Sequence, residues 1–177
     1  MRTLPLLMSV VLAAGVVSTS PAATKLTGTL YSAAMDKEVP YAISLPTEYN
    51  GSPQRIYPVL YGLHGQGAPY DTWTSMPPLW RAIDGEYPAI VATFEGENSF
   101  FLDFREDTDN QYTTFFFEEF VPYVESTWRA GRSAGMRAVT GFSMGGYGAW
   151  HYMLERPEFF ASVSALNHVV GHQEGTV

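Results

Sequence analysis

A serine flanked by glycines, between a strand-like and a helix-like segment, constrains this chain more than any other feature. Residues Gly141 to Gly145 read Gly-Phe-Ser-Met-Gly, with a strand expected at Arg137–Thr140 and a helix expected at Tyr147–Glu155. A strand that turns this sharply into a helix crowds its own backbone, so glycine is needed on both sides of the serine. The turn leaves the hydroxyl of Ser143 above the C-terminal edge of a sheet, where a base and a substrate can reach it. Ser143 is therefore the candidate nucleophile; a glycine-rich turn with an incidental serine would not explain the flanking strand and helix.

Strand-like and helix-like segments alternate over the rest of the chain, which predicts an α/β protein with a mostly parallel sheet and helices on both faces. The chain has 177 residues, enough for one domain with a sizeable core. The expected strands are Lys25–Tyr31, Val39–Leu45, Tyr57–Leu63, Ala89–Phe94, Arg137–Thr140 and Phe160–Leu166. The expected helices are Pro78–Ile83, Thr113–Thr127 with a bend at Pro122, and Tyr147–Glu155.

A second glycine-rich segment, His64-Gly65-Gln66-Gly67, follows the expected strand that ends at Leu63. In a fold of this kind that loop supplies one backbone N–H to the oxyanion, and the residue after the nucleophile supplies the other. We assign these two donors to Gln66 and Met144. A histidine in such a motif more often braces the loop by hydrogen bonding than acts as the base, and we expect the same of His64.

Four pieces of the chain resemble one known family in their order and spacing. They read Tyr57-Pro-Val-Leu-Tyr-Gly-Leu-His-Gly, Glu95-Gly-Glu-Asn-Ser-Phe, Phe117-Glu-Glu-Phe-Val-Pro-Tyr-Val-Glu and Val139-Thr-Gly-Phe-Ser-Met-Gly-Gly-Tyr-Gly-Ala. Over about residues 27–166 the chain is similar to the esterase D family of α/β-hydrolases. That family includes feruloyl and acetyl-xylan esterases, S-formylglutathione hydrolases and mycolyltransferases.

The resemblance implies that residues 24–177 are the N-terminal part of an α/β-hydrolase esterase domain, and it implies residues that border the pocket. Those residues are His64, Gly65, Glu95 and Asn98. The chain departs from the family at Ala68, where a further glycine is common, and at Glu95-Gly-Glu-Asn, where the family often has Asp-Gly-Gly-Asn. We expect the second departure to alter substrate selectivity.

A serine nucleophile needs a histidine base and a carboxylate that orients it, in the chain order Ser, acid, His. The resemblance implies that both partners lie beyond further strands, so we expect the triad Asp and His, and the C-terminal strands, to be absent from this chain. The simplest interpretation is a fragment or truncated reading frame that folds poorly alone, is nearly inactive, and leaves Phe160–Leu166 as an exposed apolar edge strand.

Local residues offer weak substitutes for the missing base. His151 lies eight residues along the expected helix, about 12 Å from Ser143 at 1.5 Å per residue. Glu155 and Glu158 are most simply solvated charges. His168 and His172 follow the last expected strand, and His168 is within reach of Ser143, but no acid lies between that strand and His168.

The N-terminal segment 1–23 predicts a secretory signal peptide. Arg2 is followed by an apolar run from Leu4 to Val17 and by small residues, with cleavage expected near Ala22 or Ala23. The alternative is a buried N-terminal helix, and the ordered pattern argues against it. We expect an extracellular or periplasmic protein, and the absence of cysteine excludes disulfides and a lipid-modified cysteine anchor.

Several partners and cofactors are disfavoured by composition. The net charge is −8 and no Lys/Arg cluster exists, so nucleic acid is not an expected partner. The apolar run of the leader is too short to span a membrane. No Asp/His cluster is present, so we expect neither a metal nor another cofactor.

The sequence thus predicts a secreted serine esterase that forms an acyl-enzyme on Ser143. Secretion and a content of 15% aromatic residues favour carbohydrate-linked feruloyl or acetyl esters as substrates. One alternative is acyl transfer to a sugar hydroxyl, and the other is a non-catalytic remnant that lacks the base. The sequence alone leaves both alternatives, and the oligomeric state, open.

Overall fold

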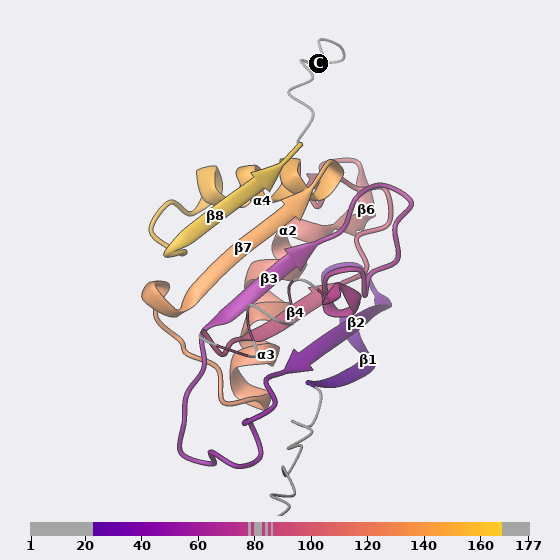
Figure 1. Cartoon of the computed structure of the whole chain (residues 1–177). Helices are drawn as coiled ribbons and strands as arrows, with labels where there is room; N and C mark the ends of the chain where they lie inside the picture. Colours follow the sequence, from indigo (N-terminus) through magenta and orange to yellow (C-terminus); the bar gives the residue numbers. More distant parts are fainter. Residues whose placement is uncertain (1–22, 78, 80–82, 84, 86, 168–177) are drawn as a thin grey trace, which may run out of the picture.

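The computed structural model describes residues 23–77, 79, 83, 85 and 87–167, and its centre is a six-stranded sheet (Figure 1). The strand order is β1-β2-β4-β3-β7-β8; β1 and β2 run antiparallel to their neighbours, and β4, β3, β7 and β8 are parallel to one another. This is the mostly parallel sheet that the sequence predicted. The strands are β1 (Thr24–Ser32), β2 (Lys37–Leu45), β3 (Val59–Leu63), β4 (Ile90–Phe94), β7 (Arg137–Phe142) and β8 (Ser162–Leu166).

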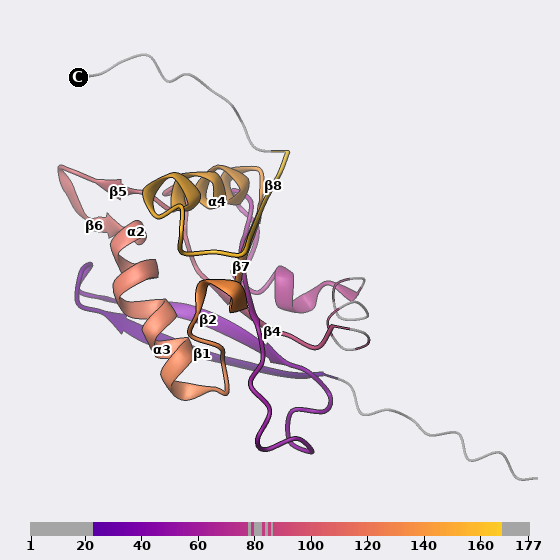
Figure 2. The ribbon, with the colours of Figure 1, turned by 90° about the vertical axis from the view of Figure 1, so that its left-hand side faces the viewer.

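The helices cover the two faces of this sheet unequally (Figure 2). The run α2 (Tyr112–Thr114), η2 (Phe115–Phe120) and α3 (Val121–Thr127) shares one face with α4 (Met144–Glu155), and η1 (Trp73–Ser75) lies on the other. Alternate residues of β4 serve the two sides, because successive side chains of a strand point to opposite faces. Ile90, Ala92 and Phe94 join the large core under α4 and η2, whereas Val91 packs with Trp73.

The long helix expected at Thr113–Thr127 changes its hydrogen-bond register just before Pro122. The segment η2 is a π-helix, in which the N–H of Val121 donates to the carbonyl of Phe116, five residues earlier. Proline has no N–H and its ring clashes with the carbonyl four residues back in a regular α-helix. The wider turn accommodates Pro122 at the start of α3, so the predicted bend takes the form of a π-helical turn.

Two parts of the prediction need correction or lie outside the described residues. The predicted helix Pro78–Ile83 falls mostly on residues that the structure does not describe. The hairpin of β5 (Asp103–Phe104) and β6 (Asp107–Gln111) was not predicted, because its sequence is polar and lacks apolar alternation. The hairpin also has a structural role: Asp103 Oδ1 accepts the N–H groups of Thr113 and Thr114 at 2.8 and 3.1 Å and so caps the helical run. A short 3-10 turn, η3 (Ala134–Met136), precedes β7.

Strand β8 lies at one edge of the sheet in the described part of the chain. It pairs with β7, and Leu166 at its end is 47% exposed. The strand is shorter than the predicted Phe160–Leu166, because Phe160 lies before it and packs against the core. The neighbouring helix α4 also exposes two large apolar side chains, Trp150 and Leu154.

Candidate active site

Ser143 lies at the junction of β7 and α4 in a strained backbone conformation. Its φ and ψ are 54° and −116°, and non-glycine residues rarely adopt a positive φ. Such a conformation costs about 1–3 kcal/mol and persists only where the surroundings enforce it. Two hydrogen bonds do so here: the N–H of Ser143 donates to Leu166 O at 2.9 Å, and the N–H of Tyr147 donates to Ser143 O at 3.1 Å.

The two glycines beside Ser143 are required by close backbone approaches. A Cβ added to Gly141 would lie 1.9 Å from the carbonyl oxygen of Gly145. A Cβ added to Gly145 would lie 2.2 Å from the carbonyl oxygen of Leu63 and 2.6 Å from that of His64. The first turn of α4 therefore packs directly on the backbone at the end of β3, with no room for a side chain.

The loop after β3 lies against the nucleophile turn. A Cβ added to Gly65 would lie 3.7 Å from Ser143 Cβ. The loop closes through a hydrogen bond from Ala68 N–H to Gly65 O at 3.0 Å, with Gly67 at a φ of 72°. Within the described residues, no hydrogen bond occupies the backbone N–H of Gln66 or of Met144. Both donors are thus free for a ligand, and their role as the oxyanion hole stays a prediction.

His64 connects this loop to the loop that follows β4. Its side chain is 1% exposed, and its Nε2 accepts the N–H of Gly96 at 2.9 Å. An accepting Nε2 implies a proton on Nδ1, which donates to Gly65 O at 2.9 Å. Both ring nitrogens are then occupied in a neutral imidazole, an arrangement that suits a brace better than a general base.

Glu95 lies beside His64 without forming an ion pair in this protonation state. Its Oε1 is 3.1 Å from His64 Nε2, but that nitrogen already accepts the N–H of Gly96. The same carboxylate oxygen accepts the N–H of Glu97 at 2.7 Å. Glu95 thus stabilises the turn of its own loop, and Asn98 is exposed at the tip of that turn.

The loop from Glu95 to Phe101 is strained and brings an aromatic residue near the site. Glu97, Phe100 and Phe101 have φ values of 49°, 56° and 62°. Phe101 points into the core, where its ring centroid lies 5.3 Å from that of His64. Phe100 instead meets Tyr147 of α4, edge to face, with centroids 5.8 Å apart. Neither member of this pair was predicted as a site residue. The available signal was an aromatic residue four positions after Ser143 and another in the loop that begins at Glu95.

Of the weak substitute bases, those in the described part of the chain are not hydrogen-bonded to Ser143. Among the described residues, no hydrogen bond reaches the Ser143 hydroxyl. His151 is partly buried beside Tyr152 on α4, and Glu155 and Glu158 are exposed. His168 and His172 lie outside the described residues.

The described part of the chain offers neither a metal site nor a membrane-spanning helix. Within residues that the structure describes, no group of three or more His, Cys, Asp or Glu side chains is placed to hold a metal ion. The helices of the described ranges are too short or too polar to traverse a bilayer.

Comparison with known protein sequences gives esterases as relatives. The model of the Esterase family matches residues 32–171. An esterase of Mycobacterium tuberculosis is 32% identical over 126 residues, which are 70% of this chain and 27% of that protein. The acetyl esterase of Caldicellulosiruptor saccharolyticus is 30% identical over 108 residues, 61% of this chain and 40% of that protein.

Solved structures extend the comparison to the fold. A ferulic acid esterase superposes with a TM-score of 0.75 and 28% identity, covering 88% of this chain and 63% of that one. An S-formylglutathione hydrolase from Staphylococcus aureus superposes with a TM-score of 0.69 and 20% identity, covering 84% and 59%. The chain thus spans less than two thirds of the length of each of these relatives.

Proposed function

The chain belongs to the Esterase family, and from this premise we propose that it is a carboxylic-ester hydrolase that forms an acyl-enzyme on Ser143. The family and the α/β-hydrolase fold expected from the four sequence pieces are confirmed. The observation that carries the assignment of Ser143 is its strained backbone, with a φ of 54° at a strand–helix junction against the loop of Gly65.

The proposed reaction has two halves. Ser143 Oγ attacks the ester carbonyl, and the resulting oxyanion accepts hydrogen bonds from the N–H groups of Gln66 and Met144. The N-terminal end of α4 adds a favourable dipole at the same point. Collapse of the intermediate expels the alcohol and leaves an acyl group on Ser143, which water then hydrolyses.

Proton transfer requires a histidine and a carboxylate that the described residues do not bring to Ser143. We propose that these groups come from beyond the described part of the chain. His64 is assigned to positioning, because its hydrogen bonds to Gly65 and Gly96 hold the oxyanion loop against the pocket loop. Its removal is expected to weaken transition-state binding without removing the base.

The proposed substrates are carbohydrate-linked esters with feruloyl or acetyl groups. Two of the relatives are named as a ferulic acid esterase and an acetyl esterase, which supports both acyl groups. Secretion would bring the enzyme to such substrates, and we propose residues 1–23 as its signal peptide. N-terminal sequencing of the protein exported by an expressing bacterium tests the cleavage near Ala22 or Ala23; a start at Met1 in the exported protein would contradict it.

Covalent labelling tests the nucleophile. A fluorophosphonate probe should attach to Ser143, as located by peptide mass spectrometry, and Ser143→Ala should abolish the labelling. Ser164→Ala on the exposed side of β8 is the matched control and should label like the wild type. Labelling at another residue would contradict the proposed function, and no labelling in the wild-type chain would favour the non-catalytic remnant over the hydrolase.

A further inference from the structure

The aromatic pair of Phe100 and Tyr147 lies at the margin of the core, next to the turn that holds the candidate nucleophile. Both side chains are only partly buried, whereas Phe101, the neighbour of Phe100, is fully buried. Tyr147 begins the second turn of α4, and its N–H donates to the carbonyl of Ser143 at 3.1 Å. Side chains on a helix lean toward its N-terminus, so the ring of Tyr147 leans toward the turn that holds Ser143.

The backbone around Phe100 is held firmly in its strained form. Ser99 Oγ donates to Gly96 O at 2.6 Å and accepts the N–H of Phe101 at 3.0 Å. A Cβ added to Gly148 of α4 would lie 2.8 Å from Phe101 Cβ and 3.0 Å from Phe100 O, so the loop and helix meet at van der Waals distance. This contact holds the backbone of Phe100 against α4, where its ring meets that of Tyr147.

We propose that Phe100 and Tyr147 form one wall of the acyl site and select esters of planar, unsaturated acyl groups of the hydroxycinnamoyl type over acetyl esters. This inference rests on the proposed function and decides between its two acyl groups. A conjugated ring system offers a face and an edge for contacts with both aromatic side chains, whereas an acetyl methyl group reaches little of that surface. Because the backbone of Phe100 is already held in place, little further ordering of this loop is needed on binding.

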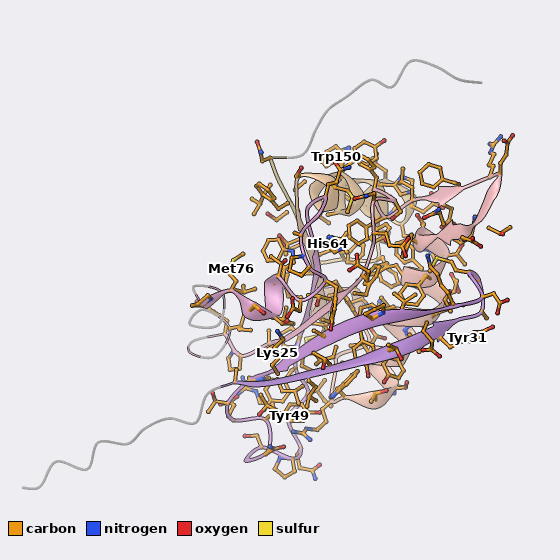
Figure 3. All side chains as sticks on the ribbon, turned by 90° about the vertical axis from the view of Figure 1, so that its right-hand side faces the viewer. Lys25, Tyr31, Tyr49, His64, Met76 and Trp150 are labelled. Atoms are coloured by element: carbon orange, nitrogen blue, oxygen red, sulfur yellow. The ribbon has the colours of Figure 1, made fainter. Side chains whose placement is uncertain are left out.

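The test separates binding from catalysis by using methyl ferulate as the probe in a Ser143→Ala background. Phe100→Leu and Tyr147→Leu are each expected to weaken its binding, measured by ligand-observed NMR titration, about tenfold. Tyr147→Phe keeps the ring and should keep the affinity. Tyr31→Leu is the matched control, since Tyr31 is 53% exposed on β1, far from His64 and the site (Figure 3).

Fluorophosphonate labelling of the same chain with Ser143 restored distinguishes the two proposals. Equal affinity for methyl ferulate in the parent, Phe100→Leu and Tyr147→Leu proteins would overturn the wall, even if Ser143 is labelled. A tenfold loss in both variants without labelling of Ser143 would support the wall as a binding surface and overturn the hydrolytic function. Circular dichroism of each variant confirms folding, and an equal loss in Tyr31→Leu would also refute the assignment.

Discussion

Replacing Gly145 with alanine sets two physical effects against each other at the second position of α4. Helix propensity alone favours alanine over glycine by up to about 1 kcal/mol. The structure opposes this gain, because the new Cβ would lie 2.2 Å from Leu63 O and 2.6 Å from His64 O. Both atoms belong to backbone, so no side-chain rotation relieves the clash.

The size of the opposing effect follows from the displacement that the clash demands. Ordinary contacts of a Cβ begin near 3.4 Å, so the start of α4 and the end of β3 must separate by more than 1 Å. Overpacking of this kind typically costs about 1–3 kcal/mol, and contact with a sheet backbone places this case at the upper end. After the propensity gain is subtracted, we expect Gly145→Ala to lower the free energy of unfolding by about 2 kcal/mol.

Urea denaturation followed by far-UV circular dichroism measures this difference. With a slope of about 2 kcal/mol per molar urea, the midpoint should fall by about 1 M. Gly135→Ala is the matched control, because a Cβ there meets nothing within 4 Å, and its midpoint should stay close to that of the parent. A Gly145→Ala midpoint equal to or above the parent value would refute the steric reasoning.

Three further predictions concern strain, a buried ion pair and pH. Ser143→Gly should raise the free energy of unfolding by about 1 kcal/mol, because glycine tolerates the positive φ, whereas Ser143→Ala should bring no such gain. Equal urea midpoints for the Ser143→Gly and Ser143→Ala proteins would contradict this reasoning. Glu125 is 8% exposed, and its carboxylate accepts hydrogen bonds from Arg137 at 2.6 and 3.0 Å. Glu125→Leu should therefore lower the free energy of unfolding by about 3–5 kcal/mol in the same urea assay, and a loss below about 1 kcal/mol would show that water replaces the carboxylate. The hydrogen bond from the Lys25 ammonium lowers the pKa of Asp71 below its ordinary 3.8, so the stability that this carboxylate contributes is present above pH 3.8 and is lost as the pH falls through the lower folded pKa. The difference in urea midpoint between the wild type and Asp71→Asn should therefore shrink on acidification, and a difference that widens would contradict the assignment.

Features set by short-range sterics could be predicted from the sequence. The apolar runs of β3 and β4 admit few alternatives to buried strands, and the structure confirms both. The strand–turn–helix context of Ser143 could be predicted because the motif needs glycine where two backbones meet. A Cβ at Gly141 or at Gly145 would lie only 1.9 or 2.2 Å, respectively, from a backbone carbonyl oxygen.

Features set by tertiary contacts could not be predicted. Nothing local marks Phe100 for a positive φ, since glycine or asparagine would adopt it more readily. The conformation is enforced by Ser99 and by the contact with Gly148, which lies far along the chain. The π-helical register before Pro122 likewise is one of several ways to accommodate a proline, and packing of the phenylalanines in η2 selects it.

The close approaches at Gly65, Gly141 and Gly145 have a consequence for how a site of this kind can diverge. The position of Ser143, the proposed nucleophile, relative to the loop after β3 is determined largely by main-chain atoms, so it is insensitive to most side-chain replacements nearby. Residues such as Phe100 and Tyr147 lie around this frame rather than within it. A library that randomises them should therefore yield altered substrate preference far more often than loss of nucleophile geometry, which makes this loop–helix contact a natural starting point for directed evolution.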